Sequence, residues 1–258
     1  MMNLTEKKKG FSRLLMCGLV ALSLGACSTV PEGERDIGEI YDPMEGVNRG
    51  IFAFNDAVDT IFLEPVARGY RFITPQPVRT GVRNFLRNLR SPVQVANQTL
   101  QGDLGGAAND VGRFVVNSTV GVLGLIDVAD MVGLPYEQED FGQTLAVWGV
   151  GHGPYMVLPL MGPSSMRDAT GMMVDSFADP LRIYLYNTNQ EEWHYARLAL
   201  TVLSTREELL DVLDDLQKNS FDYYAAMRST YVQRRQALVN DQDPEQASAP
   251  AIPDFDNE

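Results

Sequence analysis

A cysteine near the N-terminus carries the clearest chemistry of the sequence. Cys27 follows Leu24-Gly25-Ala26, and this order matches the bacterial lipobox, in which the thiol is acylated and the chain is cut before the cysteine. A basic segment over residues 7–13 and a short apolar run over residues 14–22 precede it, as in a secretory signal. The run is too short to remain as a transmembrane helix. We therefore predict a signal peptide over residues 1–26 and lipidation, with acyl chains such as palmitate, at Cys27; the alternative is an ordinary signal peptide with an incidental cysteine.

The charge of the chain restricts what it can bind. Removing residues 1–26 takes away four basic residues and one acidic residue, so the net charge changes from −13 to −16. Such an acidic chain does not bind nucleic acid by neutralising phosphates, nor is it attracted to an anionic membrane surface. We expect attachment through acyl chains, at about 0.8 kcal/mol per buried methylene, and through apolar surface. Ser28, rather than an aspartate, follows Cys27, which favours the outer membrane, with the protein facing the periplasm.

Residues typical of enzymes are scarce. Cys17 leaves with the signal peptide, and His152 and His194 are the only histidines, so a zinc site of the usual kind lacks ligands. The glycines at 149–153 lack the Lys-Ser/Thr of a phosphate loop and are typical of turns. No glycine follows Ser164 at the spacing of a nucleophile elbow. We expect no metal, no cofactor and no enzymatic activity, although a carboxylate pair in a cleft remains open.

Three arginines lie beside apolar stretches and could bind an anion. They are Arg113, Arg167 and Arg197. Because an unpaired buried guanidinium costs several kcal/mol, each must have an acidic partner, reach water or face a wet channel. In a channel, each could attract a phosphate through a charge-assisted hydrogen bond. The alternative is a side chain that extends to the surface or an ordinary ion pair, for which His194 and Glu191 lie near Arg197 in the sequence.

The elements that would position these groups are mostly helical. Apolar residues recur at helical spacing from Val78 to Leu89, with arginines on the opposite face, which predicts an amphipathic helix with a basic face. Residues 110–122 and 193–203 also favour helix. Ser204-Thr205-Arg206-Glu207 matches a capping box and predicts the start of one or two helices that run to about Asn240. Strand signals are weak, so we expect an all-α fold.

Two long stretches carry no charge. Residues 141–166 could in principle cross a bilayer by length, but five glycines and three prolines make one spanning helix implausible. Two short pieces joined by a turn suit one leaflet, because roughly ten helical residues rise about 15 Å, half of the hydrocarbon core. Residues 114–126 form a second such stretch. The alternative is that both are buried core segments of a soluble domain.

The domain organisation follows from composition. Residues 27–41 are expected to form a lipidated tether, and residues 42–240 one domain, since no linker interrupts them. Residues 241–258 are acidic and rich in proline, with too little apolar content to fold, so we expect a disordered tail.

Seven segments in order carry a family resemblance. They are DPMEGVNRGIFAFND (residues 42–56), PVARGYR, TPQPVRTGVRNFLRNLRSP, LQGD, RFVVNSTVGVLGLIDVA, FGQTLAVWGVGHGPYMVLPLMGPSSMRD and STREELLD. Between about Asp42 and Tyr231 the chain closely resembles the MlaA (VacJ) family of outer-membrane phospholipid-transport lipoproteins. The resemblance implies a ring of amphipathic helices in the inner leaflet of the outer membrane around an amphipathic channel. It also implies association with a trimeric porin and delivery of phospholipid to a periplasmic carrier protein.

Moving a phospholipid requires apolar walls for its tails and polar contacts for its head group, and no bond is broken. The candidates for this path are Asn48, Phe52, Asn55 and Asp56 in the first segment, together with the three arginines above. We therefore expect a passive conduit that removes mislocalised phospholipid from the outer leaflet and so maintains lipid asymmetry. The alternatives are a structural lipoprotein that tethers or stabilises porins, and a lipid-modifying hydrolase, which would lack an assembled nucleophile and base.

Overall fold

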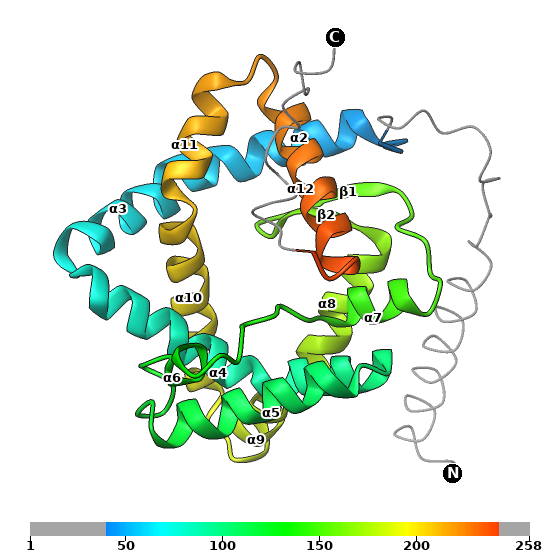
Figure 1. Cartoon of the computed structure of the whole chain (residues 1–258). Coiled ribbons are helices and arrows are strands. Elements are labelled where there is room, and N and C mark those ends of the chain that lie inside the picture. Colours follow the sequence, from blue (N-terminus) through cyan, green and yellow to red (C-terminus); the bar gives the residue numbers. More distant parts are fainter. Residues whose placement is uncertain (1–39, 243–258) are drawn as a thin grey trace, which may run out of the picture. The chain divides into compact units, whose positions relative to one another are not determined.

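The computed structural model describes residues 40–242, which form one mostly helical domain (Figure 1). The predicted signal peptide, Cys27, most of the predicted tether and nearly all of the predicted tail lie outside the described residues. The elements, in order, are α2 (Glu45–Val58), the π-helix η1 (Asp59–Leu63), α3 (Glu64–Ile73), α4 (Gln76–Gln101), α5 (Leu104–Thr119), α6 (Val128–Met131), α7 (Phe141–Val147), β1 (Tyr155–Leu158), β2 (Gly162–Ser165), α8 (Met166–Ala178), α9 (Pro180–Asn187), α10 (Glu191–Glu208), α11 (Leu210–Asn219) and α12 (Tyr223–Val239).

The helices of this domain follow one another around a circuit (Figure 1). α3 packs on α10 and α11, α4 contacts α5, α7 and α10, and α7 packs on α8. α12 then contacts α7 and β2, and α2 contacts β1, which closes the circuit. The extended segment between α6 and α7 is tied to α4 and α5, because Gln94 donates to the Glu137 carbonyl and Asn109 to the Pro135 carbonyl. The ring-like, mainly helical fold expected from the sequence is confirmed.

α4 contains the predicted amphipathic helix, and its basic face is neutralised by other helices. Arg79 pairs with Glu207 at 3.2 Å, while Arg83 and Arg87 pair with Glu208 at 3.4 and 3.3 Å. Both glutamates lie at the end of α10. The arginine row therefore attaches α4 to the end of α10. A single surface pair contributes little to stability, whereas several pairs along one face form a network.

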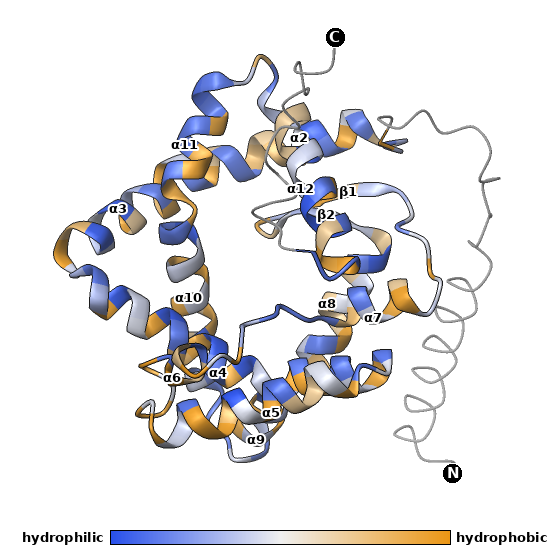
Figure 2. Cartoon of the chain, viewed as in Figure 1, coloured by the Kyte–Doolittle hydropathy of each residue, from blue (hydrophilic) through white to orange (hydrophobic). Residues whose placement is uncertain are grey.

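The distribution of polar and apolar side chains is unusual. The largest fully buried side chains are mostly polar: Tyr155, Leu210, Gln94, Gln143, Asn48, Asn97, Thr144, Ser164 and Ser165. The buried apolar cluster is small and consists of Tyr155, Val157 and Tyr224. In contrast, Phe72 at the end of α3 is 91% exposed. Hydrophobic positions recur along the helices of the circuit (Figure 2). Soluble monomers rarely expose so much apolar surface, so this distribution indicates an apolar partner.

Two expectations from the sequence need correction. The capping box at Ser204 is wrong, because Ser204 is buried in the penultimate turn of α10, which ends at Glu208. The second half of the uncharged stretch 141–166 is not helical but forms a hairpin, with Tyr155 opposite Ser165 and Leu158 opposite Gly162. The hairpin is possible because Leu160 and Gly162 both adopt positive φ at its turn, at 63° and 86°.

Within residues 40–242, no helix combines the length and the apolar character needed to cross a bilayer. The second uncharged stretch, residues 114–126, consists of the end of α5 and a turn. Val122 and Leu123 have φ values of 53° and 60° in this turn and are exposed. This backbone is strained for a β-branched residue, so the turn displays apolar side chains at a local cost in energy.

Candidate functional site

Two asparagines of α2 hold the hairpin in place. Asn48 Nδ2 donates to the Tyr155 carbonyl at 3.1 Å, and its Oδ1 accepts from the Val157 amide at 3.0 Å. Asn55 repeats the pattern at the end of β1 and in the turn that follows, donating to the Leu158 carbonyl at 2.9 Å and accepting from the Leu160 amide at 2.8 Å. A spacing of seven residues puts both amides on one face of the helix. Together they pair with backbone groups of β1 and of the turn that follows it, while the Tyr155 amide donates to the Tyr41 carbonyl.

The other two candidates on α2 differ from this pair. The Phe52 ring packs edge-on against Tyr223 and Tyr224, with centroids 5.2 and 5.5 Å apart, and borders the apolar cluster. Asp56 is half-buried, and burial, together with the charges of Asp59 and Glu64, raises its pKa. Phe52 therefore has a packing contact, whereas Asp56 is a carboxyl group in an acidic environment.

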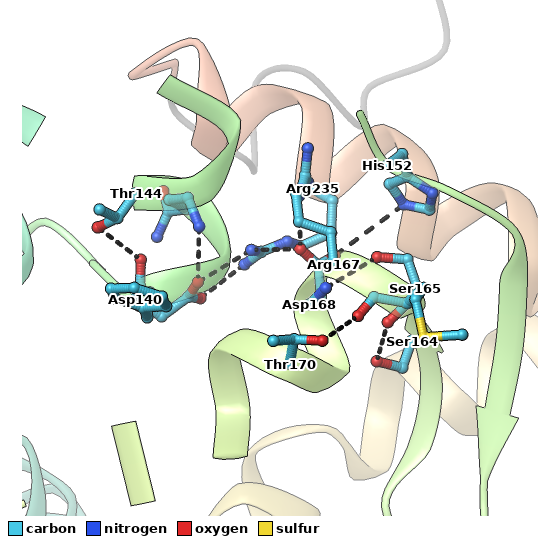
Figure 3. Close-up of polar contacts among 12 residues, drawn as sticks. Asp140, Thr144, His152, Ser164, Ser165, Arg167, Asp168, Thr170 and Arg235 are labelled. Atoms are coloured by element: carbon cyan, nitrogen blue, oxygen red, sulfur yellow. Dashed lines mark hydrogen bonds and ion pairs between the residues drawn. The ribbon is translucent and has the colours of Figure 1, made fainter. Parts of the chain in front are cut away.

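A buried network of charges joins three helices (Figure 3). Arg235 of α12 donates to Asp140 at the start of α7 through two nitrogens, at 2.6 and 3.0 Å, and to Asp168 in the first turn of α8 at 2.9 Å. Burial by itself raises the pKa of both carboxyl groups, but the hydrogen bonds and charge of Arg235 outweigh it and hold both below the usual value. Removing one partner of such a buried network leaves an uncompensated charge.

The same network contains a serine, a histidine and an aspartate, but not in a catalytic arrangement. Ser165 is fully buried, and its hydroxyl accepts from the Asp168 amide at 3.0 Å as the cap of α8. His152 Nε2 lies 4.0 Å from Asp168 Oδ2, and burial lowers the pKa of the imidazole, although Asp168 opposes this. Tyr231 donates a hydrogen bond to the same carboxylate. These residues position α8 rather than pair a nucleophile with a base.

The three arginines beside apolar stretches are all paired. Arg113 donates to Asp127 at 2.6 Å and to the Leu134 carbonyl, Arg167 donates to Asp168 at 3.0 Å, and Arg197 pairs with Asp179. The alternative of an ion pair therefore holds, and for Arg197 the partner is Asp179 rather than Glu191. The reason is the high cost of burying a lone guanidinium.

A small polar cavity lies between α4 and α5. Its lining residues are Asn84, Arg87, Asn88, Ser91, Gln94, Asp110, Arg113, Asn117, Asp127 and Tyr136. Within this part of the structure, Asp110 Oδ2 and Asn88 Oδ1 are buried without a hydrogen-bond partner. Burial and the charge of Glu137 raise the pKa of Asp110 to about 6. The cavity is therefore lined by polar side chains, although the helices of this domain expose many apolar side chains at the surface.

The described residues hold no group of three or more His, Cys, Asp or Glu side chains arranged for a metal ion. The network of Asp140, Asp168 and Arg235 was not identified from the sequence. Arg235 lies 95 residues after Asp140 and 67 residues after Asp168, so no local pattern connects them. A local signal was available, because Asp140 and Ser165 each stand at the cap position of a helix that starts within or just after the uncharged stretch.

Fold and site together define a class: helical proteins with a polar interior and an apolar outer surface that associate with lipid or with an apolar partner. The chain belongs to the MlaA lipoprotein family, which matches residues 40–238. This confirms the resemblance noted from the sequence.

Relatives of known sequence and structure agree with this assignment. The intermembrane phospholipid transport system lipoprotein MlaA of Escherichia coli K12 is 37% identical over 203 residues, which cover 77% of this chain and 78% of that protein. The protein of the same name from Haemophilus influenzae is 30% identical over 88% of this chain and 90% of its own. A structure solved for a study of the structural basis for maintenance of bacterial outer membrane lipid asymmetry matches with a TM-score of 0.68 and 37% identity, covering 77% of this chain and 99% of that one.

Proposed function

We propose that this protein is an outer-membrane lipoprotein that acts as a passive conduit for phospholipid. It removes mislocalised phospholipid from the outer leaflet and so maintains the lipid asymmetry of the outer membrane. The observation that carries this proposal is the similarity to relatives named as lipoproteins of an intermembrane phospholipid transport system, over more than three quarters of the chain. The many buried polar side chains and exposed hydrophobic side chains of the domain support it.

The physics of the lipid explains why such a domain suits this task. The exposed apolar side chains contact hydrocarbon, while the interior offers amides, hydroxyls and carboxylates to a head group. α5 and α10, with 16 and 18 residues, are about 24 and 27 Å long, and their exposed apolar residues suit a position along one leaflet rather than across the bilayer. Transfer needs no nucleotide and no metal, and its direction comes from the proteins that accept the lipid.

The roles of the candidate residues divide by their contacts. Asn48 and Asn55 position the hairpin, and Arg113 and Arg197 tie their helices to Asp127 and Asp179. Arg167 pairs with its neighbour Asp168 within α8. We propose that Phe52 and Asp56 lie nearer to the path, since Asp56 has no cation paired with it among the described residues.

The anchor and the partners complete the proposal. Cys27 carries the acyl chains and holds the domain in the inner, periplasmic leaflet of the outer membrane. A trimeric porin surrounds or borders the domain, and a periplasmic carrier protein receives the phospholipid. In a Cys27→Ser variant we expect an uncleaved precursor that no longer fractionates stably with the outer membrane; normal processing and fractionation would contradict lipidation at this residue.

Deletion of the gene tests the function. We expect phospholipid to accumulate in the outer leaflet, measured by labelling of surface-exposed lipid, while the amount of porin trimers stays normal. Expression of the wild-type chain should reverse the accumulation. If porin trimers fall and outer-leaflet phospholipid does not rise, the protein is a porin tether and the conduit is refuted.

A further inference from the structure

We propose that the corner formed by α9 and the adjoining ends of α8 and α10 binds the phosphodiester head group of an anionic phospholipid at the bilayer surface. This corner is separate from the α2 and hairpin region, from the charge network of Figure 3 and from the cavity between α4 and α5. The inference rests on the proposed function only in placing the domain at a phospholipid bilayer. The proposed site is a place where the surface of the protein contacts the bilayer, and it is not a step in phospholipid transport.

The cation of this site is Arg182. Its guanidinium carbon lies 4.7 Å from the centroid of the Phe177 ring and 5.1 Å from that of Tyr186, and one nitrogen donates to the Ser176 carbonyl at 2.9 Å. No carboxylate of residues 40–242 lies within ion-pair distance of Arg182. The aromatic faces and the carbonyl hold the planar group in place, and its remaining donors suit two phosphate oxygens.

The nearest acid is already engaged. Asp179 pairs with Arg197 and also caps α9 by accepting from the Leu181 amide at 3.0 Å. Glu191 and Glu192, in the first turn of α10, are the other acids of this corner, and no ion pair joins either of them to Arg182. A negative partner for Arg182 is therefore missing from the described part of the chain, which leaves the site complementary to an anion.

Neutral donors stand beside the cation. The hydroxyl oxygens of Tyr186 and Tyr195 are 3.1 Å apart, so one hydroxyl donates to the other and the second proton is available to an external acceptor. The His194 ring stacks edge-on between them, with its centroid 5.7 Å from each, and its Nδ1 is buried without a partner. Burial and the charges of Arg197 and Arg182 lower the pKa of His194, consistent with a positive local potential.

The surroundings identify the anion as a lipid head group rather than free phosphate. Trp193, Tyr184 and Tyr195 are 64%, 60% and 58% exposed on the same corner. Tyrosine and tryptophan prefer the boundary between hydrocarbon and water, because one end is apolar and the other polar. Since the chain as a whole carries a net charge of −13, an anionic membrane attracts it only where a local cation such as Arg182 overcomes the general repulsion.

The lipid preference at this corner can be measured by fluorescence. The full chain carries two tryptophans, so Trp148→Phe leaves Trp193 as the only reporter, and this protein is reconstituted in phosphatidylethanolamine bilayers. Quenching of Trp193 is compared for brominated phosphatidylglycerol and brominated phosphatidylethanolamine at equal mole fractions. We expect the anionic lipid to be preferred about fivefold at low salt, and the preference to fall as salt rises. Equal quenching by the two lipids would overturn the proposal.

Matched variants attribute the preference to this site. Arg182→Gln should reduce it to about one, whereas Arg182→Lys should keep part of it, because the charge remains but the planar fork is lost. Arg234→Gln makes the same change of charge at an exposed position on α12 and should have no effect. Circular dichroism and melting of each variant verify the fold.

If the Arg182→Gln variant is folded and keeps the preference, the site is refuted. The readout is independent of lipid transfer, since it reports equilibrium contact with bilayer lipid. A protein that fails to transfer phospholipid but retains the preference would refute the conduit and leave this site in place. Loss of the preference with normal transfer in Arg182→Gln would support the site as a docking contact.

Discussion

Asn48 offers a sharp test of how the hairpin is held. Asn48 is 2% exposed, and its amide makes three hydrogen bonds, to the Tyr155 carbonyl, to the Val157 amide and to the Asp42 carboxylate. Asn48→Ala leaves the backbone groups of Tyr155 and Val157 without partners in a buried site. Because an unsatisfied buried donor or acceptor costs about 1–3 kcal/mol, we expect a loss of about 2–5 kcal/mol in the free energy of unfolding.

Asn55→Ala is the matched control, since it removes the same kind of amide from the same face of α2. Asn55 is only partly buried, and Leu160, one of its two partners, is exposed, so water can replace the lost bonds. We expect a loss of about 1 kcal/mol or less.

The assay is denaturant unfolding of the two variants under identical conditions, together with hydrogen exchange of the Val157 amide. Exchange should accelerate strongly in Asn48→Ala and little in Asn55→Ala. Equal losses of stability in the two variants, or a loss below about 1 kcal/mol for Asn48→Ala, would refute the argument that burial of the amide holds the hairpin.

Three further predictions concern the charged groups. Arg235→Met should cost about 3–5 kcal/mol of unfolding free energy, because two buried carboxylates lose their cation. Arg234→Met, at the adjacent exposed position, should change it by no more than about 0.5 kcal/mol. If thermal denaturation gives similar losses of stability for the two variants, the network is not a structural element. Burial raises the pKa of Glu139 to about 7, above its unfolded value, so the stability that Glu139 contributes is present below about pH 4.5 and is lost as pH rises through 7. Glu139→Gln should flatten this pH dependence and stabilise the protein at pH 8. An unchanged pH profile of the melting temperature would contradict the raised pKa of Glu139. Arg197→Asp should destabilise α9 by placing two carboxylates together. The added exchange Asp179→Arg should restore only part of the melting temperature, because the Asp179 carboxylate also caps α9. If lipid transfer stays impaired in a folded double variant, Arg197 also contacts lipid.

The helical elements were largely predictable because helix formation is local. The apolar residues from Val78 to Leu89 repeat every three to four positions, and they lie in α4 as expected. Residues 110–122 and 193–203 fall mainly in α5 and α10. Hydrogen bonds between a residue and the fourth before it depend on nearby sequence alone.

The hairpin and the end of α10 could not be predicted in the same way. Residues 155–158 show no alternation of apolar and polar types, and their edge is satisfied by side chains more than a hundred positions away in the sequence. Ser204 has the residues of a capping box around it, but a pattern of four residues does not reveal whether the helix has already begun. It had begun at Glu191, and burial against other helices decided the outcome.

The candidate residues divide along the same line. The sequence by itself determined the helical class, the lipobox around Cys27, the family resemblance and the positions of the arginines beside apolar stretches, since all of these depend on residue type and local order. Only the tertiary structure decided that Asn48 and Asn55 hold a strand, that Arg113, Arg167 and Arg197 have acidic partners, and that Arg182 has none among the described residues. The physical reason is that an ion pair or a buried hydrogen bond depends on distance and orientation in space, which the folded chain alone fixes.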